Sequence, residues 1–308
     1  MDVQSAQEIL TAHGVLEVIE RCEPLRQGYS SDVKYILWAD GQPRLLLRLS
    51  TIELLARRQS EFNALAVHYG RGILCPRPIA FGQTPDRTHC FTLLEYLPGD
   101  CAEDVLPKLD RRIQHRIGMA AGAELRRLHQ LEGDEPSEVW FARRLRKYRL
   151  RVQQAREMQL GFPRQAEVEE YVEAHVSVLE GSPVRFQHDD FHPGNVIVRD
   201  GRYAGIIDFN RCDWGDPVED FYKVPWFSAP LSKAFAQGQT EGYLEHGAVP
   251  DFWLRYNLLV AMNLHGSLVW ERQNSSSERQ SVWLDHVVEM VESHDLQTSG
   301  PPAWFTND

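Results

Sequence analysis

The sequence predicts an α+β fold of two lobes: a small antiparallel-sheet lobe with one long helix, and a larger, mostly helical lobe that carries a β-hairpin. Two observations predict this division. Short apolar runs separated by turn residues dominate up to about residue 97. After Gly99 the apolar residues recur at helical spacing, interrupted only by two short apolar runs on either side of Asp200 and Gly201. We therefore place residues 1–97 in one lobe and residues 98–308 in the other.

The composition limits the classes of protein that fit. The chain has 308 residues, of which 43% are hydrophobic, enough for the cores of two lobes. Its formal net charge of −11 argues against a nucleic-acid partner, which needs a basic face, and is compatible with a cationic small molecule. The five cysteines contain no CxxC pair, and no apolar segment approaches the ~20 residues of a membrane span. These features predict a soluble, cytoplasmic protein with no membrane partner.

The small lobe alternates strand patterns with turn signals. Its expected elements are a helix over 5–13, strands over 15–22, 32–38, 44–49, 75–82 and 89–99, and a helix opened by a capping box at 50–53 and ended by Gly70 and Gly72. Asp40 and Gly41 predict a two-residue hairpin turn. That turn would pair Val33 with Arg48 and place Lys34 on the opposite face, whereas a three-residue turn would reverse the faces.

The larger lobe shows helical spacing almost throughout. Its expected elements are helices over 109–131, near 136–158 and over 165–180, a hairpin over 195–208, a helical region over 217–293 and an irregular tail.

The hairpin carries polar residues at its open end. A two-residue type I′ turn at Asp200 and Gly201 would pair Arg199 with Arg202, Ile197 with Ala204 and Asn195 with Ile206. Asn195 and Asp208 would then share one face, close enough for their side chains to converge on one ion. Amide and carboxylate oxygens suit Mg²⁺, and Asp190 precedes Asn195 by five residues.

The stretch HDDFHPGN, from His188 to Asn195, and the later Ile207, Asp208 and Phe209 resemble the catalytic and metal-binding motifs of the aminoglycoside phosphotransferase family. That family is similar to the protein kinases in fold, so the resemblance implies a bilobal protein-kinase-like fold. It makes residues 1–97 the nucleotide-binding lobe and residues 98–308 the catalytic and substrate-binding lobe. It also implies that Asp190 is the catalytic base, that His188 supports the loop, and that Asn195 and Asp208 hold Mg²⁺ on the phosphates of ATP.

The same resemblance assigns the nucleotide side. Its implied residues are Gly28, Ser30 and Ser31 in the loop over the phosphates, Val33 beside the base, Arg48 in the place of the usual strand lysine, Glu61 as the ion-pair partner of Arg48, and Glu95 and Leu97 in the hinge. Lys34 is an alternative to Arg48, and a solvated helix face is the alternative for Glu61. The resemblance departs at the third motif, where Asn210 replaces the glycine of Asp-Phe-Gly.

An acidic turn follows the hairpin, as it does in this family. We expect Asp220 to anchor the catalytic loop through backbone hydrogen bonds and Asp216 to cap the helix that starts at Pro217. Asp213 and Glu219 are expected at the solvated surface, with contact to a cationic substrate as the alternative. Asp189 stands where the family usually has a small residue, and we expect it to take no part in the chemistry.

These expectations predict a small-molecule kinase that moves the γ-phosphate of ATP to a hydroxyl group. The acceptor would be an aminoglycoside or another antibiotic, which would make the protein a resistance enzyme. Sugars, amino alcohols and homoserine are alternative acceptors. A catalytically inactive nucleotide-binding protein is the alternative that the arginine at position 48 suggests.

Overall fold

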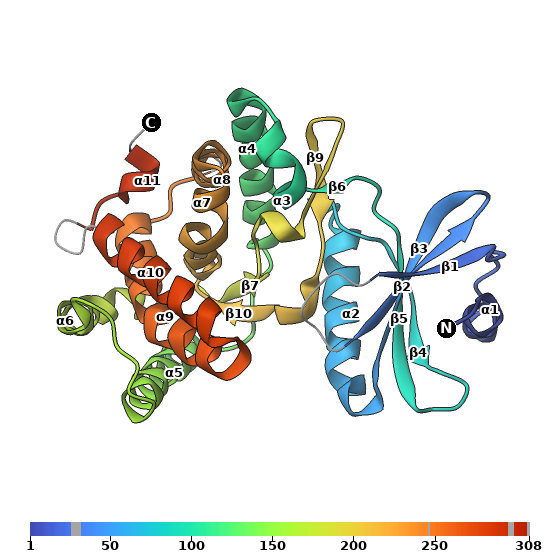
Figure 1. Ribbon diagram of the computed structural model, residues 1–308, viewed down its shortest axis with the longest axis horizontal. Helices are drawn as coiled ribbons and strands as arrows, with labels where there is room; N and C mark the ends of the chain where they lie inside the picture. The colour runs from blue at the N-terminus through green and yellow to red at the C-terminus, as the bar shows by residue number, and fades with distance from the viewer. Residues whose placement is uncertain (26–31, 246, 295–298, 307–308) are drawn as a thin grey trace. The chain divides into compact units, whose positions relative to one another are not determined.

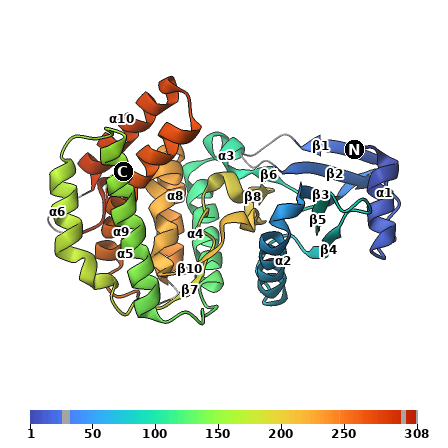
Figure 2. The same ribbon diagram turned by 90° about the horizontal axis from the view of Figure 1, so that it is seen from below.

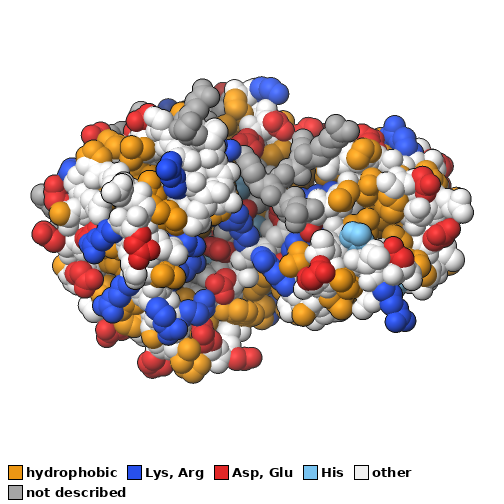
Figure 3. Space-filling model, turned by 60° about the horizontal axis from the view of Figure 1, so that its bottom comes forward, with side chains coloured by type: hydrophobic (Ala, Val, Ile, Leu, Met, Phe, Trp, Pro, Cys, Tyr) orange, Lys and Arg blue, Asp and Glu red, His pale blue; other side chains and the backbone are white. Residues whose placement is uncertain are grey.

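The computed structural model describes residues 1–25, 32–245, 247–294 and 299–306 (Figure 1). The chain forms two compact units, one of residues 1–102 with 195–211 and the other of residues 103–194 with 212–308. Within the described ranges, no helix is both long and apolar enough to cross a membrane. On the face drawn in Figure 3, acidic and basic side chains are interspersed.

The first unit is built on a five-stranded antiparallel sheet of order β1-β2-β3-β5-β4. Its strands are β1 (Arg21–Leu25), β2 (Val33–Ala39), β3 (Gln42–Thr51), β4 (Pro78–Gln83) and β5 (His89–Glu95). Helix α1 (Val3–Ala12) packs on one face, where Leu10 is buried against Leu47 and Phe91 of the central strands. These strand residues alternate with polar ones, so the opposite face of the sheet carries Arg48 and Ser50 toward α2 (Leu55–Gly70).

The expected strand over 15–22 is wrong for most of its length, because β1 begins only at Arg21. Leu16 and Val18 are 91% and 75% exposed, so they lack the burial that the apolar pattern suggested. The side chain of Gln7 instead bonds the backbone of this segment, donating to the Glu17 carbonyl and accepting from the Ile19 N–H. These bonds tie the segment to α1 rather than to the sheet.

The β2–β3 hairpin has the predicted turn but a different register. Asp40 and Gly41 take φ values of 51° and 70°, as a two-residue type I′ turn requires. A bulge beyond the turn, between the pairs Leu37–Leu45 and Trp38–Pro43, inserts one extra residue into β3. Lys34 therefore lies opposite Arg48, and the predicted pairing of Val33 with Arg48 is wrong.

Helix α2 does not begin with the predicted capping box. Ser50 and Thr51 continue β3, a single 3₁₀ turn follows over Ile52–Leu54, and α2 begins at Leu55. The hydroxyl of Ser50 accepts a hydrogen bond from Arg58 Nε at 3.0 Å, and the side chain of Thr51 caps nothing. The serine is therefore a partner of a buried arginine. The helix ends at Gly70, as predicted.

The second hairpin also contains a bulge. Strands β8 (Val196–Arg199) and β9 (Arg202–Ile206) pair Arg199 with Arg202 as predicted, but Val196 lies opposite Ile206. The predicted pairs Ile197–Ala204 and Asn195–Ile206 are wrong, because Ala204 is the extra residue of β9.

This hairpin belongs to the first unit, not to the larger lobe in which we expected it. Strand β6 (Asp100–Cys101) pairs with β8, and the Leu74 carbonyl accepts the N–H of Ile206 at 2.9 Å. Gly205 permits this close approach, since a Cβ there would lie 2.6 Å from the Leu74 oxygen. The boundary between lobes at residues 97 and 98 stays a prediction.

The second unit is mostly helical, as predicted (Figure 2). Its helices include the short α3 that starts at the unit boundary: α3 (Ala102–Val105), α4 (Arg111–Leu128), α5 (Ser137–Glu157), α6 (Gln165–His175), α7 (Ala229–Leu231), α8 (Lys233–Glu245), α9 (Phe252–Asn274), α10 (Ser277–Ser293) and α11 (Ala303–Thr306). Helices α4 and α8 lie side by side at short range, because Gly122 of α4 faces backbone of α8 with no room for a Cβ. A buried core of aromatic residues, including Tyr243 and Tyr256, joins α8 and α9.

Candidate active site

The predicted catalytic loop, in the second unit, leaves a two-stranded sheet. Strand β7 (Arg185–Gln187) pairs with β10 (Asp213–Gly215), and the chain then turns at His188. Both oxygens of the fully buried Asp220 hold this turn: Oδ2 accepts the N–H of His188 at 2.8 Å and Oδ1 accepts that of Asp189 at 2.6 Å. The predicted anchor is confirmed, and a carboxylate bound by backbone N–H groups fixes the loop in one position.

The anchor itself is held from α4. His129 Nε2 lies 2.9 Å from Asp220 Oδ2, and His129 Nδ1 lies 2.8 Å from the hydroxyl of Tyr243. His188 is fully buried, and its ring makes a T-shaped contact with that of Phe191, with the centroids 5.9 Å apart. The supporting role of His188 stays a prediction.

Asp189 and Asp190 have different surroundings. Asp189 has a left-handed backbone (φ 55°), and burial beside Glu219 raises its pKa to about 7. The Asp190 side chain is 19% exposed, and its Oδ1 lies 3.0 Å from Lys223 Nζ and 3.7 Å from His192 Nε2. Lys223 was missed by the sequence reasoning. The only signal for it was a single cation inside the apolar run FYKVPWF.

The rest of the acidic turn is structural. Asp216 is buried and caps the 3₁₀ helix η6 (Pro217–Lys223) by accepting the Val218 N–H at 2.8 Å, as predicted. Glu219 is wrongly predicted as a surface residue, since it is buried and 2.7 Å from Arg144 Nε. Asp213 is half-exposed and paired with Arg143 at 3.2 Å, as a surface residue would be.

In the first unit, the open end of the second hairpin holds Asn195 and Asp208. The bulge in β9 removes the pairing of Asn195 with Ile206 from which we predicted that Asn195 and Asp208 share a face. The Asn195 carbonyl instead accepts the N–H of Ile207, the residue before Asp208, at 2.9 Å. Asn195 is 8% exposed, and Asp208 takes a left-handed backbone (φ 66°).

The donor set at this end fits Mg²⁺. Asp208 Oδ1 is buried and has no hydrogen-bond partner among the described residues, which is costly for a carboxylate unless a cation compensates it. Within the same residues, no group of three or more His, Cys, Asp and Glu side chains could hold a metal. One carboxylate and one amide are the few protein ligands that Mg²⁺ needs when substrate phosphates complete its shell.

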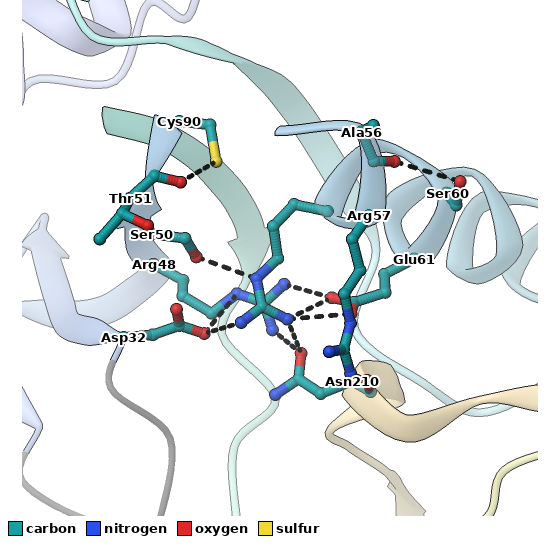
Figure 4. A network of polar contacts seen from close by, with 11 residues as sticks. Asp32, Arg48, Ser50, Thr51, Ala56, Arg57, Ser60, Glu61, Cys90 and Asn210 are labelled. Atoms are coloured by element: carbon teal, nitrogen blue, oxygen red, sulfur yellow. Dashed lines mark hydrogen bonds and ion pairs between the residues drawn. The ribbon is translucent and has the colours of Figure 1, made fainter. Parts of the chain in front are cut away.

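Arg48 is the centre of a buried ionic network on the α2 face of the sheet (Figure 4). Its guanidinium lies 3.0 Å from Glu61 and 3.7 Å from Asp32, and it donates to the side chain of Asn210. The ion pair with Glu61 confirms the predicted partner, and the solvated-face alternative is wrong because Glu61 is 6% exposed.

Two further arginines share these carboxylates. Arg58 lies 2.7 Å from Glu61 and 2.8 Å from Asp32, and Arg57 lies 3.1 Å from Glu61. Arg57 also donates to the backbone carbonyl of Asn210 at 2.9 Å. The network thus contains three cations and two anions, an excess of positive charge that suits a polyphosphate. The asparagine that departs from the Asp-Phe-Gly pattern is one of its members.

The corrected register adds Lys34 to the Arg48 face, since directly paired residues share a face. No hydrogen bond or ion pair of Lys34 is found within the described part of the chain, whereas Arg48 has three side-chain partners. Val33 lies on the other face and is 48% exposed, so the reason for placing it beside the base is lost. The ammonium group of Lys34 is thus the cation on this face whose charge no described side chain neutralises.

The hinge continues from β5. The Glu95 N–H donates to the Arg77 carbonyl and the Tyr96 N–H to the Arg44 carbonyl, both at 2.8 Å. The Glu95 N–H is therefore already bonded on the side away from β3, and Leu97 follows the end of β5, so the hinge roles of Glu95 and Leu97 stay predictions. Gly28, Ser30 and Ser31 lie outside the described residues.

Comparison with known proteins decides the family. A model described as "Phosphotransferase enzyme family" matches residues 21–253, which is most of the chain. The chain belongs to this phosphotransferase family. The family membership makes the protein an enzyme that transfers phosphate, as the resemblance of its motifs implied. No protein with a curated description is significantly similar to the chain in sequence.

Solved structures agree on the fold of this phosphotransferase. An ADP-bound aminoglycoside phosphotransferase, APH(2″)-Ib, is 16% identical with a TM-score of 0.64, over 94% of this chain and 98% of that one. A streptomycin–ATP complex of APH(2″)-IIa is 17% identical with a TM-score of 0.64, over 96% and 97%. A GDP complex of an aminoglycoside 2′-phosphotransferase-IIIa is 16% identical with a TM-score of 0.65, over 94% and 97%. These matches confirm the protein-kinase-like fold.

Proposed function

We propose that this phosphotransferase moves the γ-phosphate of ATP to a hydroxyl group of a small molecule. The observation that carries the proposal is the Asp220-anchored loop, which fixes a partly exposed carboxylate, Asp190, at the motif position of a catalytic base. The five cysteines are all free, which fits the cytoplasmic location that we also propose.

The reaction that we propose balances simply. The acceptor oxygen forms a bond to the γ-phosphorus while the bond from that phosphorus to the bridging oxygen of ADP breaks. The acceptor's proton passes to Asp190 and then to solvent, so ATP and an alcohol give ADP, a phosphate ester and a proton. Phosphoryl transfer depends on positioning and charge neutralisation, and a loop held by backbone hydrogen bonds supplies the first.

On the nucleotide side, Asn195 and Asp208 would hold Mg²⁺, which neutralises charge on the phosphates when it is bound. Arg48 and Lys34 would face the phosphates from the sheet, with Glu61 orienting Arg48. The backbone carbonyl of Glu95 and the backbone of Leu97 would bind the base, since the Glu95 N–H is already donated to Arg77. Gly28, Ser30 and Ser31 lie outside the described residues and stay the predicted loop over the phosphates.

A coupled assay of ADP release tests the proposal across a panel of aminoglycosides, sugars and amino alcohols. Asp190→Asn should abolish transfer while leaving the dissociation constant of Mg-ATP within about twofold, because the amide cannot take the proton. Unchanged kcat would remove Asp190 from its role. Mg²⁺-dependent ATP binding by the wild type without ADP release for any acceptor would favour the inactive nucleotide-binding alternative.

A further inference from the structure

A cluster of five side chains surrounds the proposed base. We call it the Lys223 cluster; its members are Asp190, His192, Lys223, Phe227 and Trp283. All five belong to the second compact unit. Within this cluster, Lys223 is a charged group that the catalytic motifs and the predicted metal site do not account for.

Lys223 is held in place by its surroundings. Its ammonium lies 3.0 Å from Asp190, and 5.1 Å and 5.6 Å from the ring centroids of Tyr222 and Phe227. The chain then forms a π-helix over Val224–Ser228, a rare conformation that is frequent at functional sites. The buried lysine is therefore a fixed positive charge beside the reacting carboxylate.

Two carboxylates beside this loop, Glu219 and Asp220, already have partners, and a third, Glu103, approaches the loop at Gly194. Glu219 pairs with Arg144 at 2.7 Å, and Asp220 accepts two backbone N–H groups and contacts His129. Asp189, with its pKa near 7, carries only part of a charge at neutral pH. An acceptor's ammonium group brought to Asp190 would meet the like charge of Lys223, which is repulsive.

The other side of the cluster is aromatic. The Phe227 ring stacks on His192 at 4.6 Å and lies 6.4 Å from Trp283, which itself stacks on the buried Trp226 at 4.6 Å. Phe227, His192 and Trp283 are half-buried, unlike the core rings of Tyr243 and Tyr256. Partly exposed rings beside a reactive group are suited to stack on a flat or apolar part of a ligand.

We propose that the Lys223 cluster is the acceptor subsite, and that it selects a hydroxyl compound with a flat apolar ring and no positive charge near the reacting hydroxyl. This inference rests on the proposed function, because it names the acceptor class for the same base. It differs from the cationic acceptor that the net charge of the chain suggested.

Binding measurements test the inference separately from catalysis. Isothermal titration calorimetry of the full chain would use three probes: 4-nitrophenyl β-glucoside, glucose and kanamycin. We expect the aryl glucoside to bind about tenfold more tightly than either other probe. Phe227→Ala should remove its advantage over glucose. Lys223→Glu should shift the preference about tenfold toward kanamycin, whereas Lys233→Glu, an equal charge change at an exposed site in α8, should leave it unchanged.

Two results would overturn the inference. One is that the wild type binds kanamycin more tightly than the aryl glucoside. Loss of kanamycin binding in Glu103→Gln would then assign the cation site to Glu103, whose carboxylate approaches the loop at Gly194. The other is an equal effect of Lys223→Glu and Lys233→Glu on the preference. Both are read from binding alone, whereas a lack of ADP release with every acceptor would count against the proposed function.

Discussion

Asp220→Asn is the sharpest perturbation of the catalytic loop. The carboxylate accepts N–H groups of His188 and Asp189 at 2.8 and 2.6 Å and contacts His129 at 2.9 Å, all without solvent. An amide keeps the shape but turns one acceptor into a donor, so at least one buried N–H faces another N–H. Hydrogen bonds to charged groups contribute about 1.5–3 kcal/mol each, and a buried unsatisfied donor adds to the loss.

We expect Asp220→Asn to cost about 3 kcal/mol of unfolding free energy. At roughly 2–4 °C per kcal/mol for a domain of 150–250 residues, Tm should fall by about 6–12 °C. The loop would also lose its fixed position, and misplacement by about 1 Å costs roughly 100-fold in rate. Circular dichroism melting and ADP release, measured well below both melting temperatures, give the two numbers.

Asp216→Asn is the matched control. Asp216 is equally buried and also has three partners, Val218 N–H, Ser182 Oγ and Arg255, none of them in the loop. It should lower Tm by a similar amount but leave kcat within a few fold. Equal losses of kcat in the two variants would refute the view that Asp220 positions the loop. A Tm of Asp220→Asn within about 1 °C of wild type would refute the energy assigned to its hydrogen bonds.

Four other variants test the remaining assignments. Lys34→Met should raise the KM for ATP about tenfold at unchanged Tm, because Lys34 has no hydrogen bond or ion pair among the described residues. Arg48→Met should raise this KM and also lower Tm, because it breaks the buried pair with Glu61. Steady-state kinetics and melting give the two numbers, and equal Tm values for the two variants would contradict this distinction. Asp208→Ala should weaken Mg²⁺-dependent ADP binding roughly tenfold in a calorimetric titration, and an unaltered Mg²⁺ dependence would exclude it as a ligand. The pKa of Asp189 is about 7 in the folded protein and near 4 in the unfolded chain. Because the unfolded chain releases this proton at lower pH, the free energy of unfolding of the wild type falls as the pH rises from about 4 to 7. Asp189→Asn removes that loss, so its Tm relative to wild type should be higher at pH 8 than at pH 4, and a constant difference would contradict the shift.

Local chemistry made part of the structure predictable. Asp40 with Gly41, and Asp200 with Gly201, adopt the positive φ values that their turn type requires. Asp216 precedes a proline at a helix start and caps it. Asp220 bonds the loop from a position that the motif fixes. In the turns and the helix cap, the residue type determines the backbone conformation within a few positions of itself. In the loop, the motif fixes the spacing between the residues that bond one another.

The rest depended on contacts that no short segment specifies. Lys223 is the last residue of η6, and it reaches Asp190 because the pairing of β7 with β10 brings the segment after β10 beside the loop. Asn210 joins Arg48 across 162 positions of chain. Neither residue has a pattern of its own, since a single lysine in an apolar run and an asparagine after phenylalanine are ordinary in sequence.

The two bulges explain why side-chain faces were harder to predict than strands. A strand has a period of two residues, so one extra residue moves every later side chain to the other face. In β3 the bulge brings Lys34 to the face of Arg48, so the sheet offers a second cation where we had placed an apolar neighbour. In β9 the bulge removes the pairing from which we predicted the metal site, and the proposal of that site rests instead on two observations. The Asn195 carbonyl bonds the residue before Asp208, and Asp208 keeps a buried oxygen that a cation would satisfy.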